Sequence, residues 1–311
     1  MSVRIGHVDL CTSHPGSWVP ILRDLGAEIT CCWDSGDTRP DGFAAEFAEQ
    51  HKIANAVADP SEMIGKIDVA IVHSANWDKH VELARPFVEA GVSVLVDKPM
   101  VGCLRDANQL LDWAKMGKRV TGGSSLRFAQ EVRDFLAEPV EERGTVHTAF
   151  VGCGVDEFNY GIHAYSTLSN LMGPGIRSVR YLGASAQKHI RVEWDDGRVG
   201  FLSIGKPGPQ GAWLPFYLTA VTEKAVRQIT VAAGSIYRSL LEAVLPYLAG
   251  EQADPPIPMT ELIEPELAAM AARQSWMRGG AEVFLTDLSL DDGGYDGKQF
   301  SIEYARARLG K

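Results

Sequence analysis

The first 122 residues alternate between short apolar runs and helical patterns, and this alternation constrains the fold more than any other feature of the chain. Apolar runs of four to six residues predict buried strands, whereas apolar side chains spaced three and four apart predict helices. The predicted strands cover residues 3–8, 28–33, 57–59, 67–72, 92–96 and 119–122, and the predicted helices cover 18–25, 43–51, 79–90 and 104–116. Strands separated by helical crossovers imply a doubly wound parallel sheet.

After Gly123 the pattern changes to strands joined by tight turns, which implies antiparallel pairing. Strands are predicted at 145–151, 179–186, 190–194, 199–204, 216–222 and 225–232, and helices at 129–136, 162–172, 236–248 and 259–277. The fold class is therefore an N-terminal Rossmann-type sheet followed by an α+β domain with a mainly antiparallel open sheet. We expect a first domain at residues 1–123 and a second at 124–311; the family resemblance described below implies that the first binds a dinucleotide and that the second binds substrate and mediates oligomerisation.

Composition excludes several classes of protein. The net charge of −10 disfavours partners such as nucleic acid or an anionic membrane surface, because phosphate binding needs clustered Lys and Arg. No apolar stretch approaches the roughly 18 residues of a membrane span, and no signal peptide is visible. The five cysteines and eight histidines show no metal-ligand spacing, so we expect no metal site and a reducing, cytoplasmic environment.

The predicted strand at 92–96 runs directly into Asp97-Lys98-Pro99. Ligands bind outside the carboxyl ends of the strands in an open α/β sheet, so Lys98 emerges where chemistry is usually done, beside a carboxylate. A lysine in that position can bind an anion, hydrogen-bond a hydroxyl or transfer a proton. A surface lysine that caps a turn is the alternative interpretation of this tripeptide alone.

The turn after the first strand lacks the glycines of a dinucleotide fingerprint. Gly6 alone could match G-x-G-x-x-G, while Ser13 is a plausible N-cap and Pro15 lies near the first helical turn. Asp34 follows the second strand 28 residues after Gly6, near where an acidic residue accepts the ribose hydroxyls of NAD. Asp34 would repel the 2′-phosphate of NADP, but the nearby Arg39 leaves NADP possible.

Two further segments place polar side chains at the ends of predicted elements. Ser74 and Asn76 lie in a strand-end loop suited to holding a nicotinamide ribose, and His80 on the first helical turn has a more structural setting. Asn159-Tyr160-Gly161-Ile162-His163 opens a helix of the second domain. Because histidine exchanges protons near neutral pH, His163 is a candidate base for an alcohol oxidation, or else a cap or packing residue.

Taken together, these residues resemble the Gfo/Idh/MocA family (glucose-fructose oxidoreductase, inositol dehydrogenase and rhizopine catabolism) over nearly the whole chain. The resemblance rests on Asp97-Lys98-Pro99 in place of Glu-Lys-Pro, on Asn76 with His80, on residues 123–128 at the domain crossover and on Gly161-Ile162-His163. Such proteins pair a Rossmann domain with an open-sheet domain that mediates oligomerisation, and they oxidise or reduce sugars and polyols with NAD or NADP.

The resemblance implies specific roles in this chain. Lys98 positions the substrate hydroxyl and assists proton transfer, and His163 is the acid/base. The implied substrate-binding residues are Lys98, Arg127, Asn159, Tyr160 and His163. The implied cofactor-binding residues are Gly6, Thr12, Ser13, His14, Asp34, Ser74, Asn76, His80, Asp97, Lys98 and Arg127. The cofactor is NAD or NADP, with NAD favoured by Asp34, and the implied assembly is a homodimer or homotetramer through the C-terminal sheet.

Two departures from the family pattern support an alternative function. The glycine fingerprint is missing between Gly6 and Gly16, and Asn159 stands where the pattern D-x-x-x-H has aspartate. A descendant of the same fold that binds a sugar, regulates, or acts as a lyase or hydrolase is therefore the second hypothesis. Trp213, Tyr217 and Tyr160 could stack on a sugar ring, or could be core or interface residues.

Overall fold

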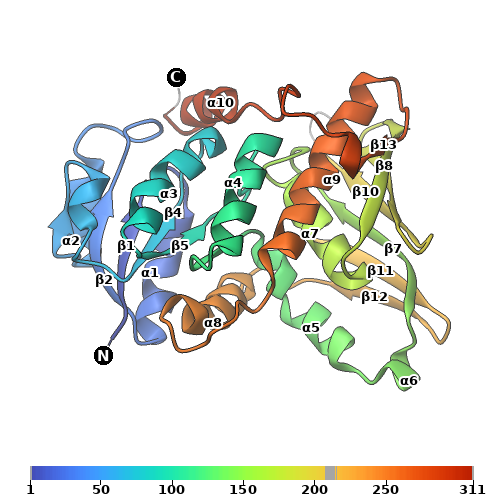
Figure 1. Ribbon diagram of the computed structural model, residues 1–311, viewed down its shortest axis with the longest axis horizontal. Helices are drawn as coiled ribbons and strands as arrows, with labels where there is room; N and C mark the ends of the chain where they lie inside the picture. The colour runs from blue at the N-terminus through green and yellow to red at the C-terminus, as the bar shows by residue number, and fades with distance from the viewer. Residues whose placement is uncertain (1, 207–213, 215, 310–311) are drawn as a thin grey trace. The chain divides into compact units, whose positions relative to one another are not determined.

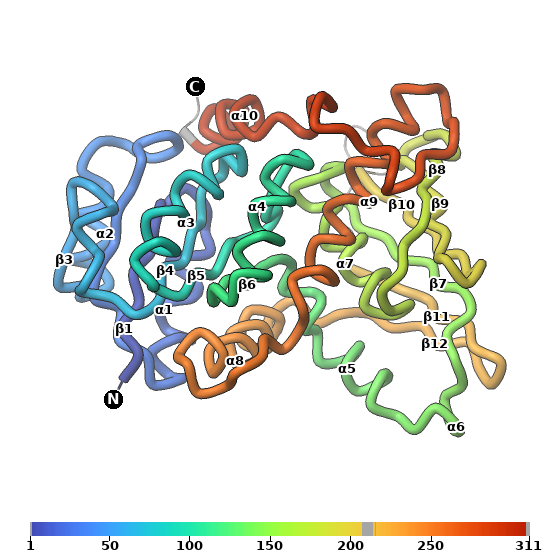
Figure 2. Tube along the Cα trace, in the orientation of Figure 1, coloured from blue at the N-terminus to red at the C-terminus, as the bar shows by residue number. Residues whose placement is uncertain are grey.

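A computed structural model describes residues 2–206, 214 and 216–309, and within it the chain divides into two compact units. The first unit comprises residues 1–123, 241–259 and 295–311, and the second comprises 124–240 and 260–294. The two C-terminal segments of the first unit were not expected from the sequence, because the strand–helix alternation that predicts this unit ends near residue 123. The tube in Figure 2 follows both segments along the chain.

The first unit contains a parallel sheet of six strands in the order β3-β2-β1-β4-β5-β6. The chain steps from β1 outward to β3 and then from β4 outward to β6, so the strand order reverses between β1 and β4. Right-handed crossovers then place the helices of the two halves on opposite faces of the sheet. This reversal is the topological switch point, outside which ligands bind in such sheets.

The strands of the first sheet are β1 (Arg4–Val8), β2 (Glu28–Trp33), β3 (Asn55–Ala56), β4 (Val69–Val72), β5 (Ser93–Val96) and β6 (Val120–Gly122). The helices of this unit are α1 (His14–Asp24), α2 (Phe43–His51), η1 (Pro60–Met63), η2 (Trp77–Lys79), α3 (His80–Glu89), α4 (Leu104–Lys115) and α10 (Gly297–Leu309). All four residues of β4 and of β5 are buried, as expected of strands covered on both faces.

The second unit contains a mixed sheet of seven strands in the order β12-β11-β7-β10-β9-β8-β13 (Figure 1). Its strands are β7 (Val146–Cys153), β8 (Ile176–Ala184), β9 (Lys188–Trp194), β10 (Val199–Ile204), β11 (Tyr217–Thr222), β12 (Val226–Thr230) and β13 (Val283–Phe284). Among the described strands of this sheet, only β7 and β10 pair in parallel. The predicted fold class, a Rossmann-type sheet followed by a mainly antiparallel sheet, is confirmed.

The remaining helices are η3 (Ser125–Phe128), α5 (Gln130–Ala137), α6 (Val140–Arg143), α7 (Gly161–Met172), α8 (Ile236–Leu248), α9 (Met259–Met277) and η4 (Leu285–Asp287). Eleven of the twelve residues of α7 are buried, because the helix packs on β7 and β10. No helix in the described part of the chain combines the length and apolarity that a membrane crossing requires.

The sequence-based predictions differ from the structure at β3, β13 and α10. The third strand was predicted at 57–59 but lies at Asn55–Ala56, where it pairs with Cys31 and Cys32 of β2. The short strand β13 and the C-terminal helix α10 were missed, since β13 has two residues and α10 has no strong apolar face.

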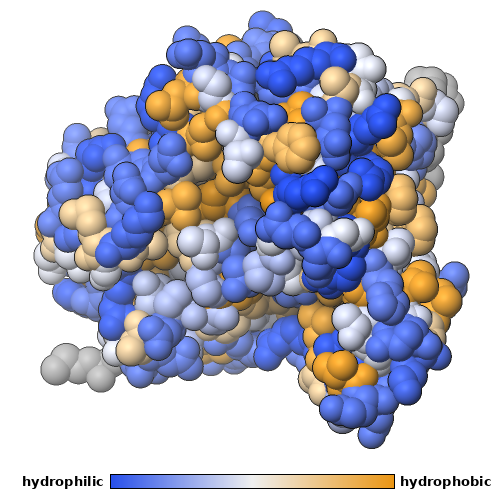
Figure 3. Space-filling model, turned by 45° about the vertical axis from the view of Figure 1, so that its right-hand side comes forward, coloured by the Kyte–Doolittle hydropathy of each residue, from blue (hydrophilic) through white to orange (hydrophobic). Residues whose placement is uncertain are grey.

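On the surface drawn in Figure 3, hydrophilic residues surround scattered apolar groups.

Candidate functional site

The turn between β1 and α1 begins at Asp9, whose backbone adopts a left-handed conformation with φ of 72°. Asp9, Cys11 and His14 have the spacing of the three glycines in G-x-G-x-x-G, directly after the strand and at the helix start. The first glycine of that motif normally supplies a positive φ, which aspartate tolerates better than most residues. The turn of a dinucleotide-binding fold is therefore present, with side chains at its three glycine positions.

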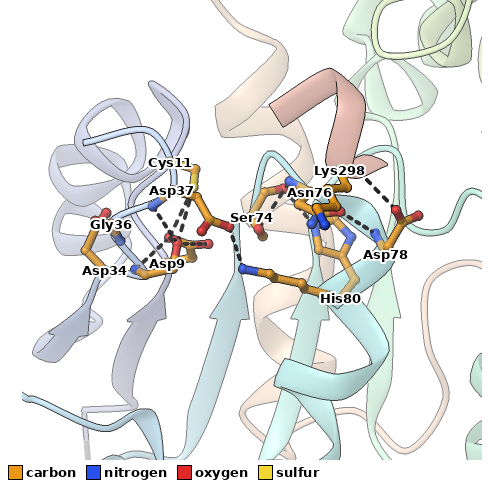
Figure 4. Close-up of polar contacts among 12 residues, drawn as sticks. Asp9, Cys11, Asp34, Gly36, Asp37, Ser74, Asn76, Asp78, His80 and Lys298 are labelled. Atoms are coloured by element: carbon orange, nitrogen blue, oxygen red, sulfur yellow. Dashed lines mark hydrogen bonds and ion pairs between the residues drawn. The ribbon is translucent and has the colours of Figure 1, made fainter. Parts of the chain in front are cut away.

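The Asp9 carboxylate is fully buried and holds this turn together (Figure 4). Its Oδ1 accepts hydrogen bonds from the Leu10 N–H at 3.0 Å, the Ser35 N–H at 3.2 Å and the Cys11 thiol at 3.2 Å. The Ser35 hydroxyl donates to the same carboxylate at 3.0 Å. Burial, followed by the charge of Asp9, raises the pKa of the Cys11 thiol to about 12, so this thiol stays protonated.

The N-terminus of α1 offers few donors to an anion. Ser13 precedes the helix, but its backbone is already helical and its side chain makes no capping bond. The Thr12 hydroxyl accepts the His14 N–H at 3.2 Å instead, and Pro15 has no N–H. Gly6 lies inside β1, where a Cβ would meet Met63 and Ile67, so this glycine serves packing within the sheet. A phosphate at this helix end therefore finds a weaker backbone cradle than a glycine-rich turn provides.

At the end of β5, Asp97 is the shared acceptor of two imidazoles and is 3% exposed. Its Oδ2 lies 2.6 Å from His14 Nδ1 and 2.9 Å from His73 Nδ1. Burial alone would raise the pKa of Asp97, but the charges and hydrogen bonds of His14 and His73 outweigh it and hold this pKa well below its usual range. The Lys98 N–H donates to Asp97 Oδ1 at 2.7 Å, so the carboxylate fixes the backbone of the half-buried lysine.

The hydrogen-bonded chain continues from His73 to His7, with 3.0 Å between His73 Nε2 and His7 Nδ1. If His73 donates from Nδ1 to the ionised Asp97, its Nε2 accepts from His7, which leaves His7 Nε2 as a buried acceptor. Within the described part of the chain this nitrogen has no partner. Burial lowers the pKa of His7 and of His73, in keeping with neutral rings. His14, His73 and Asp97 also bring potential metal ligands within 4.8 Å, a cluster that residue spacing did not reveal.

Asp34 lies directly after β2, as predicted for a residue that accepts ribose hydroxyls. Its Oδ1 accepts the Gly36 N–H at 2.8 Å, and its buried Oδ2 has no partner among the described residues. Burial raises the pKa of this carboxyl. A buried acceptor without a donor is costly, and a hydroxyl group of a ligand would satisfy it.

Three more of the predicted cofactor residues, drawn in Figure 4, lie between the end of β4 and the start of α3. The Ser74 hydroxyl accepts the Asn76 N–H at 3.2 Å, and Asn76 Oδ1 caps η2 by accepting the Asp78 N–H at 3.1 Å. His80 is fully buried at the start of α3, where its ring nitrogens lie 3.0 Å from the Met100 carbonyl and 2.9 Å from the Ser74 carbonyl. His80 therefore fixes this loop from beneath.

In the second unit, His163 is the third residue of α7 and is 5% exposed. Its Nδ1 lies 2.7 Å from the Ser124 hydroxyl, and its ring contacts Tyr160 and Phe216 edge-on at 5.8 Å and 5.2 Å between centroids. Asp156 Oδ1 accepts the Tyr160 N–H and so shapes the loop that contains Asn159. The imidazole of His163 is thus held in one orientation, as a positioned acid/base requires.

Arg127, predicted to contact both substrate and cofactor, is 4% exposed within the second unit. Its guanidinium donates to the Ser169 hydroxyl and to the carbonyl and carboxylate of Glu261, each at 3.3 Å. These bonds hold the guanidinium of Arg127 between α7 and α9, as is typical of a structural arginine. Tyr217 packs against Gly152 on the sheet and is 37% exposed, whereas Trp213 lies outside the described residues.

Comparison with known proteins finds a family to which residues 13–123 are similar. Residues 13–123 match the model of the Gfo/Idh/MocA oxidoreductase family, described as having an NAD-binding Rossmann fold. The match covers about a third of the chain, and it lies within the first unit. The resemblance inferred from Asp97-Lys98-Pro99 and its companions is therefore confirmed.

A curated relative from Amycolatopsis mediterranei (strain S699), described as a UDP-kanosamine synthase oxidoreductase subunit, is 25% identical over 231 residues. The match covers 64% of this chain and 61% of that relative. Among solved structures, scyllo-inositol dehydrogenase from Lactobacillus casei with NAD(H) and scyllo-inositol has a TM-score of 0.78 at 12% identity. It covers 92% of this chain and 100% of its own.

A second similar structure is the WlbA dehydrogenase from Chromobacterium violaceum in complex with NADH and UDP-GlcNAcA. Its TM-score is 0.73 at 16% identity, and the match covers 93% of this chain and 97% of that chain. At these identities the two structures demonstrate a shared fold across both units.

The residues of the first unit fit a dinucleotide with an altered cradle. In favour are the turn formed by the left-handed Asp9, the unsatisfied Asp34 Oδ2 and the polar loop at Ser74 and Asn76. Sequence reasoning missed Asp9, His7 and His73. The spacing Asp9-x-Cys11-x-x-His14 directly after a strand could have revealed the turn, whereas nothing local links His7, His73 and Asp97.

Proposed function

We propose that the protein is an NAD(P)-dependent oxidoreductase that acts on a hydroxyl-bearing carbon of a sugar, polyol or related compound. The observation that carries the proposal is the buried, doubly hydrogen-bonded Asp97 followed by Lys98 at the carboxyl end of β5. The match of residues 13–123 to an NAD-binding oxidoreductase family supports it.

The residues of the first unit hold the cofactor in this proposal. Asp34 Oδ2 accepts a hydroxyl of the adenosine ribose, which favours NAD, and Ser74 and Asn76 contact the ribose of the nicotinamide. The nicotinamide, when bound, supplies or accepts the hydride. In this proposal Asp97 does not contact the cofactor. It holds the backbone of Lys98 by accepting the Lys98 N–H.

Lys98 and His163 handle the substrate hydroxyl. The ammonium of Lys98 donates a hydrogen bond to the hydroxyl oxygen and stabilises the negative charge that develops as its proton leaves. His163 takes that proton in the oxidation and returns it in the reduction. The Ser124 hydroxyl, 2.7 Å from Nδ1, keeps the ring in one orientation during both directions.

The relatives' printed names support the proposed substrate class. One relative is described as acting in UDP-kanosamine synthesis, one structure holds a UDP-sugar and another holds an inositol. We therefore propose two substrate groups for this chain, nucleotide-linked sugars and free cyclic polyols.

The experiment begins with the binding of NADH and NADPH, followed by the fluorescence of the nicotinamide, and continues with oxidation assays on inositols and UDP-sugars. His163→Ala is expected to abolish turnover with unchanged nucleotide affinity. Lys98→Ala lowers kcat and raises KM, whereas Lys98→Arg, which keeps the charge, retains part of the substrate affinity. Full activity of His163→Ala would overturn its role as the acid/base.

A second candidate function is a sugar-binding or non-redox descendant of this fold. The observation that favours it is the replacement of all three fingerprint glycine positions by Asp9, Cys11 and His14. A rise in melting temperature with a sugar ligand, and with neither nucleotide at millimolar concentration, would select this candidate and exclude the oxidoreductase.

A further inference from the structure

Two arginines from distant parts of the chain meet at the β1–α1 turn. Arg39 Nε and Nη2 donate to the carbonyls of Leu10 and Thr12 at 2.9 Å and 2.8 Å. Arg308, near the end of α10, donates from Nη1 to the Cys11 carbonyl at 2.7 Å. Three consecutive carbonyls of the turn are thus bound by two guanidinium groups, which draws positive charge to the place where a dinucleotide-binding turn meets phosphate.

Neither guanidinium forms an ion pair with any described residue. Arg39 uses two of its five N–H donors in the bonds to the turn, and Arg308 uses one. Burial, followed by the charge of Arg308, lowers the pKa of Arg39, which agrees with two like charges held near each other. The charge of Asp34 opposes part of this lowering, but no carboxylate of the described residues lies within ion-pair distance, so an anion that binds both guanidinium groups would stabilise them.

The course of α10 explains how Arg308 reaches the turn. The helix begins at Gly297, packed so closely on the β4–α3 loop that a Cβ there would meet Asn76 Oδ1 and the backbone of Trp77. Asp78 accepts the Lys298 N–H at 3.0 Å, and the Trp77 ring contacts Phe300 at 4.9 Å between centroids. The helix therefore extends from the loop after β4 to the β1–α1 turn (Figure 1).

We propose that Arg39 and Arg308 form a phosphate-binding pair that replaces the backbone N–H cradle lost at Asp9, Cys11 and His14. The pair binds a phosphate group of a nucleotide through N–H donors that do not bind the turn. The inference rests on the proposed function for the identity of the nucleotide, but not for the phosphate chemistry, which follows from the two guanidinium groups.

Two phosphates of a dinucleotide could occupy the pair. The pyrophosphate is common to NADH and NADPH, whereas the 2′-phosphate belongs to NADPH alone. The Asp34 carboxylate at the end of β2 opposes a 2′-phosphate, so we assign the pair to the pyrophosphate. Comparison of the two nucleotides distinguishes these sources, because removal of a pyrophosphate contact weakens both, and removal of a 2′-phosphate contact weakens only NADPH.

The test measures dissociation constants of NADH, NADPH and inorganic pyrophosphate for the full chain and for Arg308→Ala, Arg308→Lys and Arg306→Ala. Arg306 lies in the same last turn of α10 and makes no bond to residues 10–12, so its variant is a matched loss of one charge. We expect Arg308→Ala to weaken NADH and NADPH equally, by about tenfold, with a shallower dependence on salt. We expect Arg308→Lys to recover part of the loss and Arg306→Ala to change little.

The outcomes separate this inference from the proposed function. Unchanged or tighter binding of both nucleotides by Arg308→Ala would overturn the phosphate pair and would mean that α10 obstructs the edge. Equal losses in Arg306→Ala and Arg308→Ala would also overturn it, since charge alone would then suffice. If wild-type protein binds neither nucleotide yet binds pyrophosphate in an Arg308-dependent manner, the pair stands and the oxidoreductase proposal fails.

Discussion

Asp9 and Asp97 are two buried aspartates at the carboxyl ends of parallel strands in one sheet, and they are held in different ways. Asp9 is bound by two backbone N–H groups, a hydroxyl and a thiol, and it forms the β1–α1 turn. Asp97 is bound by two imidazoles and by the Lys98 N–H. The comparison shows that a carboxylate at a strand end can replace a glycine as a structural element or can fix the backbone of a neighbouring lysine.

The largest expected effect is at Asp97. Asp97→Ala removes the acceptor of two buried imidazole donors, and each unsatisfied donor costs about 1–3 kcal/mol, so we expect a loss of about 3 kcal/mol in the free energy of unfolding. Urea denaturation measures it. Asp97→Asn keeps one acceptor oxygen and should lose less. An Asp97→Ala variant as stable as wild type would show that the imidazoles do not depend on this carboxylate.

A smaller effect is expected at Asp9, where two causes can be separated. Asp9→Ala loses the side-chain acceptor and places alanine at a positive φ, which together should cost about 2 kcal/mol. Asp9→Gly loses the same acceptor without backbone strain, so it should be about 1 kcal/mol more stable than Asp9→Ala. Asp9→Asn keeps an acceptor and serves as the control. Equal unfolding free energies for the alanine and glycine variants would exclude a strain contribution.

The smallest effect near neutral pH concerns the imidazoles behind Asp97. Burial lowers the folded-state pKa of His7 and of His73, so the unfolded chain takes up protons first as pH falls below about 6.5. Their contribution to stability is therefore complete above that pH and is lost progressively below it, at about 1.4 kcal/mol per unit of pKa depression. Asp97, also depressed, adds its own loss only at lower pH, below about 4.

His7→Asn tests this pH dependence, because the amide can still donate to His73 but cannot titrate in this range. Denaturation midpoints at pH 7.5, 6.5 and 5.5 should fall less steeply in the variant than in wild type. Parallel slopes would show that His7 does not contribute to the acid sensitivity of the first unit.

Local sequence patterns predicted most elements of the fold, since a strand or an amphipathic helix is encoded by residues a few positions apart. The predicted strand 28–33 and helices 236–248 and 259–277 coincide with β2, α8 and α9. The two-residue β3 was displaced because such short strands depend on pairing with a neighbour. At the site, Lys98 and His163 could be proposed from their place after a strand and at a helix start, and their roles stay predictions.

What the sequence determined by itself is the order of elements, the family resemblance of residues 13–123 and the position of Lys98 after a buried strand. The tertiary structure decided the rest. It showed the left-handed backbone of Asp9, which the spacing of Asp9, Cys11 and His14 only suggests. It joined His7, His14, His73 and Asp97 into one buried network and brought Arg308 to Cys11 across 297 positions of the chain. Such contacts depend on burial and strand order, which no local pattern encodes.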